Sequence, residues 1–192
     1  MKKLLVLIVA VLLAGCAAVV KVEGEQVVKD RLAVKLPDAW NRIAINAEPY
    51  ELWTQDGVTL DQLRMWAGVK AGQQLMRTPP AGPGQKDARV PTFAADMKPD
   101  QLVSLFEQMY SADGSRVKVT RVEPGQFAGE KGVRFEFAVT KKGNDLQLKG
   151  VGWAAVKNNE LFAATFTAPE LSFFKRQLPK VEGVVASARI KA

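Results

Sequence analysis

The chain has 192 residues, of which 47% are apolar and 24% charged; these are globular values and suffice for one ordinary domain. The formal net charge is +7, but basic residues are dispersed in runs of at most two, which argues against nucleic-acid binding because that needs a clustered patch. There is no histidine and one cysteine, which excludes an intrachain disulfide and a Cys/His zinc cluster.

The first twenty residues have the layout of a secretory signal peptide. Lys2 and Lys3 precede the apolar run LLVLIVAVLL, and small residues follow it. The alternative is an uncleaved membrane anchor, since the apolar stretch from Leu4 to Val20 has 17 residues, the lower limit of the roughly 17–25 that span a bilayer. Residues 1–15 are therefore predicted to be a signal peptide.

The apolar run ends in the sequence Leu13-Ala14-Gly15-Cys16. It resembles the lipobox of bacterial lipoproteins at every position. The resemblance implies a lipid thioether on Cys16, cleavage between Gly15 and Cys16, and acylation of the new amino group, for example by palmitate. Several acyl chains give stable membrane anchoring, whereas one does not. Because Ala17 stands where an aspartate commonly marks inner-membrane retention, the resemblance favours the outer membrane, facing the periplasm.

Residues 16–29 are predicted to be a lipidated flexible tether, followed by one domain over residues 30–192. The alternating stretches RLAVKLP and AWNRIAIN predict two strands. The pair Asp56-Gly57, between two further alternating runs, predicts a hairpin.

The segment from 77 to 98 differs in character, because four prolines and two glycines preclude regular structure there. We predict a loop on the surface and a docking place for a partner. Lys86 and Arg89 would give it a basic edge, and Phe93 an apolar contact. The competing interpretation is an insertion without function, since surface loops lengthen at little entropic cost.

A helix is predicted from Pro99, because Leu102, Leu105, Phe106 and Met109 form one apolar stripe. Four strands joined by short turns follow, up to Pro169. The sequence after Pro169 predicts a helix from about Glu170 to Leu178, a break at Pro179 and then a shorter helix. The fold class is thus α+β, with an antiparallel sheet of about six to seven strands flanked by helices.

This order of elements resembles the PsbP-like superfamily, which includes the Ran-release factor and many bacterial lipoproteins. The Pro-x-x-Trp of residues 37–40 and the Thr-Ala-Pro of residues 167–169 carry the resemblance, which covers roughly residues 30–190. It implies an αβα sandwich with no bound cofactor and no catalytic constellation. The Pro/Gly-rich loop has no counterpart in that pattern.

No nucleotide-binding, metalloprotease or serine-hydrolase motif occurs. Two Ser-x-x-Lys pairs, Ser115 with Lys118 and Ser172 with Lys175, match an acylase spacing but lack its companion motifs. We therefore expect a membrane-anchored envelope protein without catalytic residues or metal, acting as a binding or assembly factor for an unidentified envelope protein. Two alternatives stay open: a hydrolase using carboxylates or a Ser/Lys pair, and a carrier with an apolar cavity.

Overall fold

A computed structural model describes residues 19–45, 47–78 and 90–191. These residues form nine strands and two α-helices, and a π-helical turn precedes the second helix. In chain order the elements are β1 (Val19–Val28), β2 (Leu32–Ile43), β3 (Tyr50–Thr54), β4 (Gln62–Lys70), α2 (Pro99–Ser111), β5 (Arg116–Phe127), β6 (Glu130–Thr140), β7 (Gln147–Lys157), β8 (Glu160–Pro169), η1 (Glu170–Phe174), α3 (Lys175–Ala186) and β9 (Arg189–Ile190).

One antiparallel sheet contains all nine strands, in the order β1-β2-β3-β4-β8-β7-β6-β5, with β9 beside the start of β2. The strand β4 therefore lies at the centre of the sheet, between β3 and β8. The four predicted strands β5 to β8 are confirmed, as is the hairpin at Asp56-Gly57, which joins β3 to β4.

The predicted count of six to seven strands is wrong, because two strands lie in segments that were assigned otherwise. The expected tether contains β1, whose side chains are mostly exposed, so that its sequence lacks a clear apolar face. The strand β9 has two residues, too few for a periodic signal. The two strands expected early in the chain form a single strand, β2. Pro37 does not interrupt it, because this residue lies at an irregularity of the β1–β2 pairing, where its missing N–H costs no hydrogen bond between the strands.

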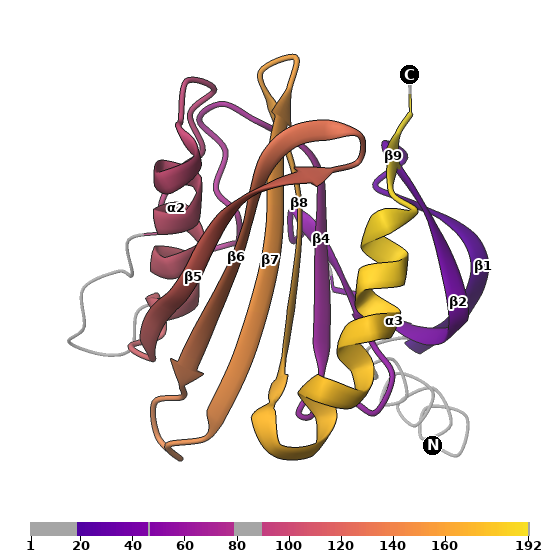
Figure 1. The fold of residues 1–192 in the computed structure, drawn as a ribbon, viewed down its shortest axis with the longest axis vertical. Coiled ribbons are helices and arrows are strands. Elements are labelled where there is room, and N and C mark those ends of the chain that lie inside the picture. The colour runs from indigo at the N-terminus through magenta and orange to yellow at the C-terminus, as the bar shows by residue number, and fades with distance from the viewer. Residues whose placement is uncertain (1–18, 46, 79–89, 192) are drawn as a thin grey trace, which may run out of the picture.

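Each helix covers one face of the sheet, and Figure 1 shows α2 and α3 on either side of the central strands β4 and β8. The side chains of α2 pack with Trp66, Phe135 and Phe137 in one buried cluster. The side chains of α3 pack on the opposite cluster, with the curled β1–β2 pair beside them. Both clusters are filled by large apolar side chains, and all four tryptophans are buried.

The helix α2 begins where the sequence has a local reason for a start, whereas α3 continues directly from η1. In α2, Pro99 occupies the first turn, and the Gln101 side chain accepts the N–H of Lys98 at 2.8 Å. The predicted break at Pro179 is wrong, because this residue lies within α3. It falls in the second turn, so the chain gives up one hydrogen bond near the helix start rather than one in the middle. None of the helices in the described ranges is long and apolar enough to cross a membrane.

Candidate functional site

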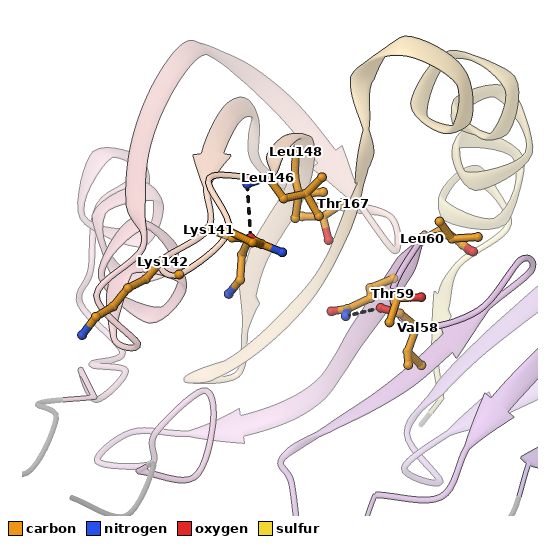
Figure 2. Close-up of a pocket in the computed structure, with 12 residues that line it drawn as sticks. Val58, Thr59, Leu60, Lys141, Lys142, Leu146, Leu148 and Thr167 are labelled. Atoms are coloured by element: carbon orange, nitrogen blue, oxygen red, sulfur yellow. Dashed lines mark hydrogen bonds between the residues drawn. The ribbon is translucent and has the colours of Figure 1, made fainter. Parts of the chain in front are cut away.

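A groove of about 490 Å³ opens at the end of the sheet where β3 passes to β4 and β6 passes to β7. Residues 58–62 form one side and the turn after β6, from 141 to 146, forms the other, with Leu148 and Thr167 between them. Figure 2 shows these two sides facing each other across the opening. We call this feature the loop groove.

The loop groove is distinguished by exposed apolar side chains. Seven large apolar residues are exposed in the part of the chain that the structure describes, and Val58 and Leu146 are two of them. They lie on opposite sides of the opening. Isolated exposed apolar residues are normal on protein surfaces, but this facing pair lines one groove and offers apolar contact to a ligand there.

The side formed by the β3–β4 loop is held rigidly by Asp61, which is 1% exposed. Its carboxylate accepts hydrogen bonds from the Thr54 hydroxyl and from the backbone N–H groups of Gln55 and Asp56, each at 2.8 Å. The Thr54 hydroxyl in turn accepts the N–H of Gly57 at 2.8 Å. Three donors satisfy the carboxylate, so Asp61 shapes the loop and has little capacity left for a ligand.

The opposite side carries two lysines. Lys141 is paired with Asp113, which follows α2, and this pair joins the β6–β7 turn to the helix end. Burial alone would raise the pKa of Asp113, but hydrogen bonds from Lys141 and Ser115 lower it below its ordinary value. The Lys142 side chain is exposed and has no carboxylate within 4.0 Å among the described residues.

The accessible chemistry of the loop groove is therefore apolar contact beside a positive edge. Its buried acid is saturated and one of its two lysines is already paired. This arrangement can hold an apolar side chain whose neighbour is acidic. The groove does not place a nucleophilic side chain beside a general base, and nucleophilic catalysis requires that pair.

Most residues that the sequence singled out fall outside this groove. Gly15 and Cys16, and also Lys86 and Arg89, lie outside the described residues. Phe93 is 1% exposed and packs in the α2 cluster, so its expected role as a partner contact is wrong. Its backbone pairs with Gln73 and Gly72, which fixes the end of the predicted loop to the β4 side of the sheet.

The structure also places the residues of the hydrolase alternative. The hydroxyl of Ser115 accepts the backbone N–H of Lys142 at 3.2 Å, and Ser172 is exposed on η1. Neither serine is hydrogen-bonded to the lysine three residues later within the described ranges. No group of three acidic or cysteine side chains suited to a metal ion occurs among residues 19–45, 47–78 and 90–191.

Sequence reasoning found the turn at Asp56-Gly57 but missed the groove beside it. Val58 and Leu146 are apolar residues next to turn signals, which is the one local cue to their exposure. Their facing positions depend on the β4–β8–β7 pairing, which brings residues 62, 167 and 150 side by side. That pairing joins segments about 100 residues apart in the chain, and no short sequence pattern encodes it.

No protein-family model and no curated protein sequence matches the chain. The solution structure of cyanobacterial PsbP (CyanoP) from Synechocystis sp. PCC 6803 is similar to this structure, with a TM-score of 0.58 at 10% sequence identity. The match covers 93% of this chain and 95% of that chain. At this level of identity the similarity concerns the fold alone, and it supports the PsbP-like fold expected from the sequence.

Proposed function

We propose that the protein is a lipid-anchored lipoprotein of the bacterial envelope that acts by binding, without catalysis, as an accessory or assembly factor. The observation that carries the proposal is the sequence Leu13-Ala14-Gly15-Cys16 at the end of an apolar run that two lysines precede. A cysteine in that position supplies the thiol that takes the lipid, and the small residues before it suit a peptidase cleft.

The fold adds a consequence for this anchoring. The first strand begins at Val19, three residues after Cys16, and three extended residues span at most about 10 Å. A lipid on Cys16 would therefore hold the β1 edge of the sheet close to the bilayer. The folded part would be positioned against the membrane rather than suspended from a long tether.

We propose the loop groove as the binding surface, and a segment of an envelope protein as its occupant. Val58 and Leu146 would take an apolar side chain, and the exposed Lys142 would favour an acidic neighbour on that segment. A groove of about 490 Å³ holds a few side chains rather than a whole domain face.

Anchoring is tested by Cys16→Ser in the native host, with membrane fractionation and intact-mass measurement. The variant should accumulate as the uncleaved precursor without lipid. A protein of mature length that stays in the membrane fraction would show that the lipobox interpretation is wrong.

Binding is tested by photo-crosslinking from residue 59 in intact envelopes, comparing wild type with Val58→Asp. The added charge should abolish the main crosslink with little change in stability, because Val58 is 38% exposed. Val122→Asp is the matched control, since Val122 is 51% exposed on β5 and does not line the loop groove. Equal crosslinking by both variants would exclude the loop groove as the binding surface.

A further inference from the structure

Arg64 projects from the middle of the sheet and has an unusual environment for a partly buried cation. It lies on β4 opposite Leu52 of β3 and Thr165 of β8, so that paired strands flank it on both sides. Its neighbours Leu63 and Met65 point into the α3 cluster, and strand alternation directs Arg64 to the α2 face. There it meets the last turn of α2.

The guanidinium of Arg64 has no carboxylate within 4.0 Å among the described residues, and Glu48 attracts it only from beyond that distance. Of the nine arginines in these ranges, seven have a carboxylate within 4.0 Å, and the two exceptions are Arg64 and Arg77. Arg77 is exposed, where water solvates the charge, whereas Arg64 is half-buried and its Nε is fully buried without a hydrogen-bond partner. An ionised group withdrawn from water without a counter-charge is costly to a fold.

The structure nevertheless holds Arg64 in place with neutral groups. Its guanidinium carbon lies 5.4 Å from the centre of the Tyr50 ring and 5.1 Å from that of Tyr110. One Nη donates to the side-chain oxygen of Gln62 at 2.6 Å. Tyr110 is itself fixed by a 2.7 Å hydrogen bond between its hydroxyl and that of Thr165. The two rings and Gln62 thus fix the orientation of the guanidinium, while its Nε–H has no hydrogen-bond acceptor among the described residues.

These residues line a small cavity of about 80 Å³, together with the Asp113–Lys141 pair and two methionines. We call it the Arg64 cavity. By the same measure a water needs about 10–15 Å³, so the cavity has room for roughly five waters or one small acidic group. Burial raises the pKa of Tyr50, so its hydroxyl keeps its proton and can donate to an anion at neutral pH.

We propose that the Arg64 cavity is a binding site for one carboxylate group, held by the guanidinium of Arg64 between Tyr50 and Tyr110. The charges lining the cavity favour a monoanion: Arg64 and Lys141 are positive, Asp113 is negative, and the sum is +1. A phosphate monoester carries more charge than this sum compensates. The carboxylate comes either from a free organic acid or from an acidic side chain of a bound peptide.

The test uses the full-length chain, purified in non-ionic detergent and kept at constant ionic strength with chloride. Acetate, inorganic phosphate and a short peptide with a central glutamate are titrated separately, and the melting temperature is followed. Acetate should raise the melting temperature saturably and more than phosphate does. Stronger binding of the peptide than of acetate assigns the carboxylate to a peptide, and equal binding assigns it to a free acid.

Two variants locate the effect. Arg64→Gln should lower acetate affinity at least tenfold, while Arg77→Gln, which removes the same charge from an exposed site, should leave it unchanged. If Arg64→Gln does not fold, the Nε–H resonance of Arg64 in ¹⁵N-arginine-labelled wild-type protein replaces it, and this signal should shift saturably with acetate. A missing shift, equal binding by both variants, or stronger binding of phosphate would overturn the proposal.

A third variant tests whether the chain supplies its own counter-ion. Residues 79–89 contain one acidic residue, Asp87. Asp87→Asn should leave acetate binding unchanged. A clear gain in acetate affinity would identify Asp87 as the partner of Arg64 and overturn the proposal of an external ligand.

Discussion

Arg64 and Arg134 occupy opposite faces of the same sheet and are both partly withdrawn from water, yet their surroundings differ. Arg134 on β6 contacts three carboxylates, those of Glu123 and Glu136 at 2.9 Å and that of Glu182 at 3.6 Å. It also lies 5.8 Å from the ring of Trp153. Arg64 has two aromatic neighbours as well, but no carboxylate within 4.0 Å among the described residues.

The difference separates a structural cation from a candidate binding cation. Burial disfavours the charge of Arg134, but hydrogen bonds and charge contacts with Glu136 and Glu123 raise its pKa overall. Its charge is compensated within the fold, and it ties β5, β6 and α3 together. Arg64 is held by neutral groups and has no carboxylate within 4.0 Å among the described residues, which is the state expected of a group that an external anion completes.

The comparison predicts its largest effect for Arg134→Met. The substitution leaves Glu136 with one weaker partner, Lys149 at 3.8 Å, and removes the contact with Trp153. We expect a loss of about 2 kcal/mol in the free energy of unfolding, below the value for a fully buried pair because the Arg134 side chain is 19% exposed. Urea unfolding measures it, and Arg121→Met, at a side chain 63% exposed, should cost under about 0.5 kcal/mol.

A glycine on β7 provides a way to disturb the Arg64 side alone. A Cβ at Gly150 would lie 2.3 Å from the ring of Phe137, and the centre of that ring lies 4.9 Å from the centre of the Tyr110 ring. Gly150→Ala should therefore displace Phe137, loosen Tyr110 and cost about 1.5 kcal/mol by overpacking. Thermal unfolding measures the loss, and acetate binding should weaken with it.

The matched control for that substitution is Gly183→Ala in α3, on the Arg134 side. A Cβ at Gly183 meets nothing within 4 Å, and alanine favours a helix over glycine. This variant should gain about 0.5–1 kcal/mol and bind acetate normally. A similar loss from both substitutions would mean that the two faces do not respond independently.

Arg64→Met should have a smaller effect on stability, in contrast with Arg134→Met. Removing the charge relieves its desolvation, while losing the contacts with Tyr50 and Tyr110 costs about 1 kcal/mol, so the two nearly cancel. We expect the free energy of unfolding in chloride buffer to change by less than about 1 kcal/mol. A loss above about 2 kcal/mol would make Arg64 a structural residue like Arg134.

The elements that the sequence predicted correctly are those with a strong local signal. The apolar stripe of α2 and the turn-separated strands β5 to β8 were placed from periodicity and turn residues. The strand β1 lies in the segment predicted to be a tether, because most of its side chains face water and the apolar alternation of a strand is absent. The backbone pairing with β2 that orders it is not visible in side-chain patterns.

The candidate sites could not be predicted in the same way. In the sequence QLRMW, Arg64 looks like the exposed position of a half-buried strand, and α2 covers that face only in the folded chain. Likewise, the apolar Phe93 in a Pro-rich segment suggested a free loop, whereas it fills a place beside α2. Burial at both positions depends on which element covers a face, and that is a tertiary property.

The smallest predicted effect concerns Asp113, which lines the Arg64 cavity and makes the stability on that side of the sheet depend on pH. Its pKa lies below the ordinary value of 3.8, so its pairing stabilises the fold at pH values above about 4. That contribution is lost as the pH falls through the lowered pKa, because the protonated acid no longer attracts Lys141. The side chain is 45% exposed, so Asp113→Asn should cost under about 1 kcal/mol at pH 7 and less at pH 3.

The same substitution also acts on the Arg64 cavity, since Asp113 is the one acidic group among the described residues that line it. Without that negative charge, the charges that line the cavity sum to +2, and Lys141 is free to contact a ligand. Acetate affinity should therefore rise severalfold in Asp113→Asn, and phosphate should gain more than acetate. Arg134 lies on the other face and contacts three carboxylates, so Glu123→Gln should lower stability without changing acetate binding. If Asp113→Asn weakens acetate binding instead, Asp113 positions Lys141 for the ligand, and the charge count that favours a monoanion is wrong.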